Sequence, residues 1–389
     1  MNLQLSLIPD YKPTLISLPS RNELFLSEQL ITYIGNKRSL LPFIADILRN
    51  ISKDLGKATL SSLDLFSGSG SVARLLKLHS SYVIANDLEH YSFLINHCYL
   101  SNKASIDWIV LEQYHQETLA YIEEHLNGKA PYTNSWIRSS YAPCDEAAIS
   151  KEDRCFYTVR NALFLDMARD YIHTLPSPYK ELLLAPLLHE ASVHVNTAGI
   201  FKGFYKNKAG IGQFGGEGKH ALQRILGEIT LELPLLSEKQ TEYDIFQENA
   251  NTLVDTLDQV DVAYLDPPYN QHPYGSNYFM LNAIAKNECP QEISLVSGIP
   301  VGWNRSNYNK QALAQDALFE CVEKLKARYV IISYNSEGFI SKEAFLAFLS
   351  QLGTVKVIEV DYNTFRGSRN LRNRGARVTE FLFVLKKGA

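Results

Sequence analysis

The sequence lacks any apolar run that approaches the roughly 20 residues needed to cross a membrane. Its first residues carry no basic start, and Pro9 and Asp10 interrupt the first apolar stretch, which argues against a secretory signal. The 5 cysteines are scattered and form no C-x-x-C pair, so neither a zinc site nor a disulfide framework is indicated. We therefore expect a cytoplasmic protein with free thiols, no bound metal and no membrane contact.

An excess of charge of one sign is also missing, because 38 basic and 42 acidic side chains give a net charge of −4. This balance argues against a protein that coats nucleic acid by charge alone, so contact with nucleic acid requires a local basic face. Basic residues gather in two segments, 202–219 and 366–377. The chain is otherwise ordinary in composition, and its 389 residues correspond to about two or three domains.

The order of apolar segments in the first hundred residues predicts a doubly wound α/β fold. Residues 60–66 are typical of a strand that ends in a glycine-rich turn, 71–79 of a helix, and 82–86 of a second strand closed by Asp87. A helix is expected from Tyr33, because apolar residues follow it at helical spacing.

The pattern breaks over residues 100–240, which predict helices and irregular structure without strongly periodic strands. Strand patterns then return at 243–247, 260–265, 329–334, 354–361 and 378–385, and helical patterns lie around 309–327 and 341–351. The economical interpretation is one parallel sheet interrupted by a large, mostly helical insertion.

The strongest chemical signal is Asp266-Pro267-Pro268-Tyr269, directly after the strand at 260–265. Ligands of open α/β sheets bind outside the carboxyl ends of the strands, so this motif lies where a ligand should bind. An exocyclic amine is a poor nucleophile, because its lone pair is delocalised into the ring. An Asp carboxylate and a nearby backbone carbonyl that accept its N–H groups free that lone pair, and a Tyr face can stack on a flipped base. The alternative is a simple turn at the end of a strand, for which Asp-Pro-Pro is well suited.

The second signal is the turn Asp64-Leu65-Phe66-Ser67-Gly68-Ser69-Gly70. Its glycines allow a ligand to approach the backbone closely. The third glycine of the dinucleotide fingerprint is missing, which disfavours an NAD-dependent oxidoreductase. Asp87 follows about 20 residues later, where an acid binds the hydroxyls of a ribose.

Four motifs, taken in order, resemble those of adenine-N6 DNA methyltransferases of the alpha motif order: Tyr33-Ile34-Gly35-Asn36-Lys37, Phe66-x-Gly68-x-Gly70, Asn86-Asp87 and Asp266-Pro267-Pro268-Tyr269. The closer likeness is to the enzymes of restriction–modification systems. It includes three further segments: Asn196-Thr197-Ala198-Gly199, Asn270-x-x-x-Tyr274-Gly275-Ser276-Asn277-Tyr278 and Glu380-x-Leu382-Phe383. The likeness covers roughly residues 31–385.

The resemblance implies a Rossmann-like, S-adenosylmethionine-dependent methyltransferase sheet that modifies N6 of a flipped adenine. Its implied partners are double-stranded DNA and a cognate restriction endonuclease that acts separately. The corresponding organisation is an N-terminal arm over residues 1–30, a catalytic domain over 31–100 and 240–389, and an inserted helical and target-recognition region over 101–239.

Site residues follow from the same resemblance. The catalytic residues are Asp266, Pro267, Pro268 and Tyr269. Cofactor contacts are expected from the N-terminal motif, the glycine-rich turn, the ribose-binding acid and the catalytic motif, namely from Tyr33, Asn36, Lys37, Asp64, Phe66, Gly68, Ser69, Gly70, Asp87, Asn249 and Asp266. Asn249 stands where the family usually has an Asp near the cofactor's adenine, although its amide oxygen can still accept a hydrogen bond.

The two basic segments are candidates for DNA contact. In the insertion, Lys202, Lys206 and Lys208 lie among glycines and aromatic residues, a composition suited to phosphate contact and to filling the gap left by a flipped base. Between the last two strands lie Arg366, Arg369, Arg372, Arg374 and Arg377, which can follow phosphates or read base edges. The resemblance adds Tyr274 and Asn277. Both basic segments are alternatively solvated surface loops.

Three other functions remain open from the sequence. Methylation of cytosine N4 or of RNA uses similar motifs, although Asp266 in place of Ser favours adenine. A catalytically silent DNA-binding module is disfavoured, because folding does not require Asp266, Tyr269 and the glycine-rich turn together.

Overall fold

The computed structural model describes residues 21–219, 221–295, 297–363 and 377–388. Within these residues, one seven-stranded sheet has the strand order β3-β2-β1-β4-β5-β7-β6. The strands are β1 Leu60–Asp64, β2 Ser80–Asn86, β3 Glu242–Phe246, β4 Val260–Leu265, β5 Ala327–Asn335, β6 Gly353–Asn363 and β7 Arg377–Lys387. The predicted α/β fold class is confirmed, and each strand lies within a few residues of its expected position.

One strand breaks the parallel arrangement expected from the sequence. β7 is antiparallel to both of its neighbours, β5 and β6, whereas the other pairs in the sheet are parallel. The apolar pattern of β7 cannot reveal this, because alternation of side chains reads the same in either direction. The sheet is therefore mixed at this edge.

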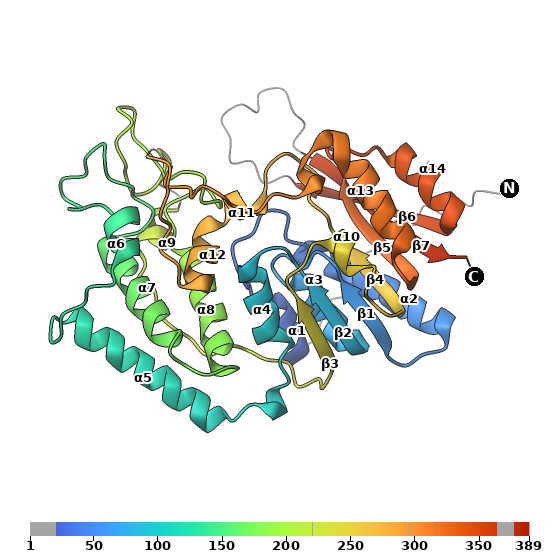
Figure 1. The fold of residues 1–389 in the computed structure, drawn as a ribbon, viewed down its shortest axis with the longest axis horizontal. Coiled ribbons are helices and arrows are strands. Elements are labelled where there is room, and N and C mark those ends of the chain that lie inside the picture. The colour runs from blue at the N-terminus through green and yellow to red at the C-terminus, as the bar shows by residue number, and fades with distance from the viewer. Residues whose placement is uncertain (1–20, 220, 296, 364–376, 389) are drawn as a thin grey trace.

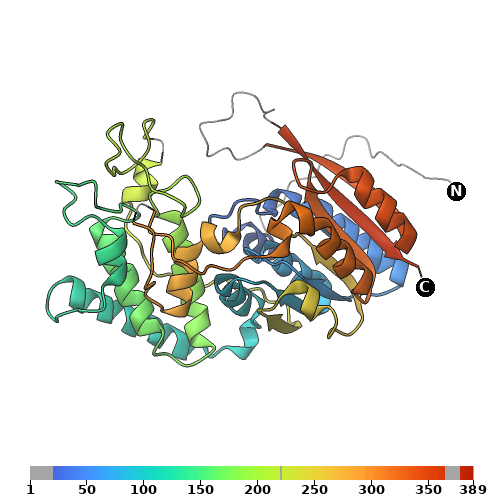
Figure 2. The same cartoon turned by 45° about the horizontal axis from the view of Figure 1, so that its top comes forward.

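Helices cover both faces of the sheet, as Figures 1 and 2 show. On one face, α2 (Leu41–Leu55) and α3 (Ser71–His79) bury leucine and isoleucine side chains against the sheet. On the other face lie α10 (Ala250–Leu253), α13 (Gln311–Lys324) and α14 (Lys342–Leu352). Along β5 the side chains alternate between the two cores, so the strand is buried on both sides.

The helix expected from Tyr33 begins later than predicted. A 3₁₀ turn, η1 (Arg38–Leu40), precedes α2, and residues 33–37 form an irregular loop in which Gly35 has a φ of 75°. Contacts of Tyr33 and Lys37 with residues far along the chain hold this loop against the sheet. The apolar residues at helical spacing, from Leu40 to Leu48, all lie in η1 and α2, so only the predicted start of the helix was wrong.

A second, helical lobe lies beside the sheet in both views (Figures 1 and 2). Its elements from the insertion are α5 Trp108–Leu126, α6 Trp136–Tyr141, α7 Val159–Ile172, α8 Tyr179–Val193 and α9 Leu222–Leu226. Their core is shared with α1 Arg21–Ser27, α4 His90–Leu100 and α12 Phe279–Lys286. The remaining short elements are η2 Lys103–Ser105, α11 Tyr274–Asn277 and η3 Asn307–Asn309.

The lobe thus joins segments from far apart in the chain. α8 packs against α4, which directly follows β2, and against α12, which follows the catalytic motif. In Figure 1, α12 accordingly lies among the helices of the insertion. The domain boundaries given above stay a prediction. Among the described residues, no helix combines the length and apolar character required to cross a membrane.

Candidate active site

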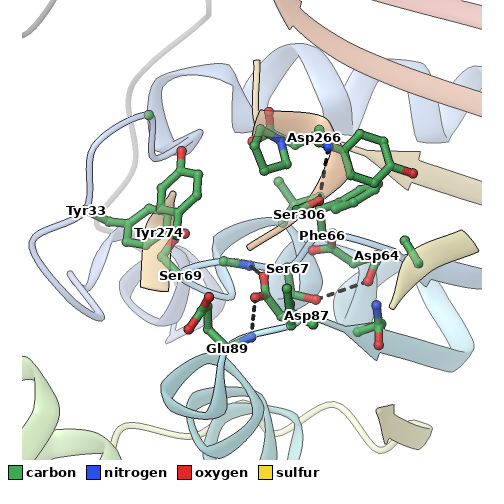
Figure 3. A pocket seen from close by; sticks show the side chains of 18 of the residues that line it. Tyr33, Asp64, Phe66, Ser67, Ser69, Asp87, Glu89, Asp266, Tyr274 and Ser306 are labelled. Atoms are coloured by element: carbon green, nitrogen blue, oxygen red, sulfur yellow. Dashed lines mark hydrogen bonds between the residues drawn. The ribbon is translucent and has the colours of Figure 1, made fainter. Parts of the chain in front are cut away.

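The principal pocket lies at the carboxyl ends of β1, β2 and β4, which meet at one edge because these strands are parallel (Figure 3). It encloses about 890 Å³, part of which is open to solvent. The residues expected from the sequence that line it are Tyr33, Asn36, Lys37, Asp64, Phe66, Gly68, Ser69, Asp87, Asn249, Asp266, Pro268 and Tyr274. The structure therefore brings together the N-terminal motif, the glycine-rich turn and the catalytic motif.

The glycine-rich turn has a backbone geometry that residues other than glycine adopt only with strain. Gly68 has a φ of 52° and Gly70 a φ of 77°, both in the left-handed region. A Cβ at Gly68 would also lie 3.0 Å from the hydroxyl oxygen of Tyr33. Gly68 N donates to Asp87 Oδ2 at 2.7 Å, and Glu89 N donates to Asp87 Oδ1 at 2.9 Å (Figure 3). Asp87 therefore ties the turn to the end of β2.

Asp64 places a buried carboxyl group in the pocket wall. Only 1% of the residue is exposed, and neither carboxyl oxygen has a partner with hydrogen-bond geometry among the described residues. Burial, with the nearby Asp266 and Asp87, raises the pKa of Asp64 well above its usual value, although the amides of Ala73 and Phe66 oppose this. A buried carboxyl that lacks a partner suits a ligand that brings a cationic group.

An ion pair between Lys37 and Asp266 holds the Asp-Pro-Pro-Tyr motif in place. Lys37 Nζ lies 3.1 Å from Asp266 Oδ1 and 3.0 Å from Glu380 Oε1. Burial raises the pKa of Asp266 to about 7, with Lys37 lowering it and Glu380 raising it. The pKa of Lys37 is raised well above its usual value, because its two carboxylate neighbours outweigh its burial. Lys37 thus links three distant segments of the chain through its contacts with Asp266 and Glu380.

Aromatic rings stack beside this ion pair. Tyr33 contacts both Tyr274 and Tyr278, with ring centroids 5.0 and 4.8 Å away, and the Tyr274 and Tyr278 rings are themselves 6.1 Å apart, so the three nearly parallel rings form one cluster. This stack attaches the N-terminal motif to α11, directly after the catalytic motif. Tyr269 is half-buried and meets Tyr334 edge-on at 6.3 Å.

The far end of the pocket is formed by Phe66 and Tyr308, whose rings meet edge-on at 5.0 Å, together with Asn249 and Ala250. Asn249 is the N-cap of α10, and its Oδ1 accepts from Asn251 N at 3.0 Å. Flat rings and a polar edge suit a planar heterocycle.

The residues expected to contact DNA lie in different environments. Lys208 is exposed, Lys206 lies over the Phe204 ring at 4.8 Å, and Lys202 is half-buried beside His272. Asn277 is buried and Tyr274 half-buried. Arg366, Arg369, Arg372 and Arg374 lie outside the described residues, and Arg377 is the first residue of β7. Their contacts with DNA stay a prediction.

Two acidic residues of the site were given no role by the sequence analysis. Glu89 lines the pocket, where its carboxylate accepts from Asn282 Nδ2 at 2.5 Å and Asn304 Nδ2 at 3.4 Å; burial raises its pKa to about 7. Glu380 was noted only as part of a motif. The available signal was an acidic residue inside an otherwise apolar strand, where a charge is rarely buried without a partner.

Comparison with known proteins agrees with this geometry. The family profile described as D12 class N6 adenine-specific DNA methyltransferase matches residues 33–348. Type II methyltransferase M.CviAII of Paramecium bursaria Chlorella virus 1 is 30% identical over 369 residues, covering 91% of this chain and 98% of that protein. Type II methyltransferase M.NlaIII of Neisseria lactamica is 27% identical over 373 residues, covering 92% and 99%. Type II methyltransferase M.FokI of Planomicrobium okeanokoites is 25% identical over 369 residues; the match covers 91% of this chain but only 52% of that protein.

Proposed function

Because this chain belongs to the D12 class of N6 adenine-specific DNA methyltransferases, we propose that it transfers a methyl group from S-adenosylmethionine to N6 of a flipped adenine in duplex DNA. The observation that carries this proposal is the position of Asp266 at the end of β4, in the wall of the same pocket as the glycine-rich turn. We further propose that the protein acts in the cytoplasm as the modification enzyme of a restriction–modification system, with a separate cognate endonuclease.

The pocket residues fit S-adenosylmethionine by their chemistry. The carboxyl of Asp64, which lacks a hydrogen-bond partner among the described residues, suits the cationic methionine end, and Asp87 suits the ribose hydroxyls. Phe66, Tyr308 and Asn249 would hold the adenine, with Tyr33 and Lys37 closing the methionine side. When bound, the cofactor supplies an electrophilic methyl group on a sulfonium.

Asp266 would make the target amine nucleophilic. Its carboxylate accepts one N–H of N6, and the resulting loss of conjugation localises the nitrogen lone pair. The amine activated in this way would be the acceptor of the methyl group that the bound cofactor would supply. The extra proton of N6 then leaves to Asp266 or to water, which restores a neutral methylated amine. The nearby ion pair keeps the accepting carboxylate in place.

The direct test is incorporation of labelled methyl groups from S-adenosylmethionine into duplex DNA, followed by digestion to nucleosides. We expect the label in N6-methyladenine. Label in N4-methylcytosine would reassign the target base, label only in RNA would reassign the substrate, and a protein that binds DNA without transfer would be a silent module.

Methyl transfer should depend on pH through Asp266. The carboxylate must be ionised to accept an N–H, and burial raises the pKa of Asp266 to about 7. As the pH falls through this value the group is protonated, so kcat/KM should fall tenfold for each further pH unit. Measurement of kcat/KM from pH 5 to 9 checks this prediction, and a profile that stays flat down to pH 5 would contradict it.

Tyr269 is expected to stack on the extruded adenine, since a base within the duplex cannot reach Asp266. Tyr269→Ala should lower kcat/KM by roughly 5- to 150-fold, because stacking on one base contributes about 1–3 kcal/mol. Tyr269→Phe keeps the ring and should remain close to the unmodified protein. Equal loss in both variants would show that the hydroxyl, and not the ring face, is what matters.

A further inference from the structure

Glu380 contributes a buried negative charge that the proposed chemistry does not itself use. It lies on β7, directly opposite Asn335 of β5, and its side chain is only 4% exposed. Its carboxylate is 3.0 Å from Lys37 Nζ, on the other side of which Asp266 lies at 3.1 Å. The result is a carboxylate–ammonium–carboxylate row in which Lys37 and Glu380 are buried and Asp266 is half-buried; it joins the loop before α2, β7 and the residue that follows β4.

The position of Glu380 is fixed by partners from one strand. Ser333 Oγ donates to Oε1 at 2.6 Å, and Asn335 Nδ2 donates to Oε2 at 3.3 Å. Both donors come from β5. Since each carboxylate oxygen is held, Glu380 presents its charge to Lys37 in one geometry.

The surroundings of Glu380 along β7 are apolar. The neighbours of Glu380 along β7 include Leu382 and Phe383, which pack in the two cores of the sheet. Replacing buried ion pairs by well-packed apolar residues is often neutral or stabilising, so the fold alone gives little reason for an acid here. The row instead ends at Asp266, beside the pocket.

We propose that Glu380 is a positioning residue for methyl transfer: it holds the Lys37 ammonium and balances its charge, so that Asp266 keeps its acceptor strength for the target amine. This inference rests on the proposed function of Asp266. Glu380 acts through Lys37 and does not line the pocket with the substrate-facing groups.

Groups from several elements face Asp266 and set the acceptor strength of its carboxylate. Lys37 comes from the N-terminal loop and Glu380 from β7. The carboxyl of Asp64 comes from β1, and the phenols of Tyr264 and Tyr274 come from β4 and α11. Lys37 is the only cation among these described neighbours. Without the Glu380 carboxylate, Asp266 alone balances the positive charge of Lys37. The Asp266 carboxylate then becomes a weaker hydrogen-bond acceptor for the target amine.

The test compares Glu380→Gln with Glu359→Gln, which removes an exposed carboxylate on neighbouring β6 that pairs with Lys342. For Glu380→Gln we expect single-turnover methyl transfer to fall roughly 10- to 100-fold, as for other residues that orient a catalytic group. Affinities for S-adenosylmethionine and DNA should change less than about twofold, because Glu380 is buried and does not line the pocket. Glu359→Gln should match the unmodified protein.

The pH profile separates a positioning role from a structural one. Loss of the Glu380 charge should lower the pKa of Asp266, so the acid limb of kcat/KM should move to lower pH by about one unit. Glu380→Asp, which keeps the charge, should return the limb toward its original place. A merely structural defect would lower the plateau and leave the limb where it was, and that result would overturn the proposal.

Three further outcomes distinguish failure of this proposal from failure of the proposed function. If Glu380→Gln does not fold, Ser333→Ala removes a hydrogen bond to Glu380 without changing charge, and it should lower the transfer rate by several-fold; an unchanged rate would refute the proposal. If the unmodified protein transfers methyl groups and Asp266→Ala does not, the proposed function stands. Normal turnover of Glu380→Gln would then refute only the role proposed for Glu380. If the unmodified protein transfers none, the proposed function itself fails.

Discussion

Asp266→Ala should reduce methyl transfer by about 10²- to 10⁴-fold, the range for loss of a positioned acceptor in the transition state. The side chain is the group at the end of β4 that can accept an N–H of the target amine from the pocket wall. Without it, the N6 lone pair stays conjugated with the ring. The binding of the cofactor and of DNA does not require this acceptor, so the loss should lie in kcat.

DNA affinity of the same variant should persist. Most affinity for DNA comes from phosphate contacts and counterion release, to which a single half-buried carboxylate contributes little. Folding should also persist, because Lys37 keeps Glu380 as a partner at 3.0 Å. Single-turnover assays, DNA titrations and thermal unfolding of the same preparations provide the three measurements.

Two controls sharpen this prediction. Asp266→Asn keeps one acceptor oxygen but loses the charge, so its rate should lie between those of Asp266→Ala and the unmodified protein. Asp316→Ala removes an exposed carboxylate on α13 and should have no effect. Turnover of Asp266→Ala at the unmodified rate would rule out this residue as the catalytic acceptor.

Gly68→Ala should sharply weaken the binding of S-adenosylmethionine, by about tenfold or more, because the glycine provides close backbone approach to the ligand. Two effects combine at this position. The backbone has a φ of 52°, and the added Cβ would lie 3.0 Å from the hydroxyl oxygen of Tyr33 and 3.1 Å from its Cε1. Tyr33 stacks on Tyr274 and Tyr278, and a shift of its ring away from the added Cβ would disturb these contacts.

Gly56→Ala separates these two effects. Gly56 ends α2 with a φ of 64°, and a Cβ there would meet no atom within 4 Å. This variant should lose about 1–2 kcal/mol of stability from the left-handed backbone and bind the cofactor normally. Isothermal calorimetry and thermal unfolding of both variants check the prediction. Equal cofactor affinity of the two variants would show that the Gly68 turn is not part of the binding site.

The sequence by itself determined the elements that depend on local spacing. The strands at Val260–Leu265 and Leu60–Asp64 could be predicted because each is an apolar run that is bounded by turn residues. The glycine-rich turn and the Asp-Pro-Pro-Tyr motif each lie within a few consecutive residues. Their chemistry and their order along the chain could therefore be inferred from the sequence. Because ligands of open α/β sheets bind outside the carboxyl ends of the strands, the sequence also predicted a ligand beside the Asp-Pro-Pro-Tyr motif.

The tertiary structure alone decided which distant side chains become partners. Lys37, Asp266 and Glu380 are more than 100 residues apart in sequence, and their contacts follow from the pairing of β5 with β7 and from the loop before α2. The same holds for the stacking of Tyr33 with Tyr278 and for the place of α12 among the inserted helices. Local periodicity carries no information about such contacts, because they are set by the packing of whole elements against one another. Lys37, for which the motif predicted only a contact with the cofactor, is therefore also the ionic partner of Asp266.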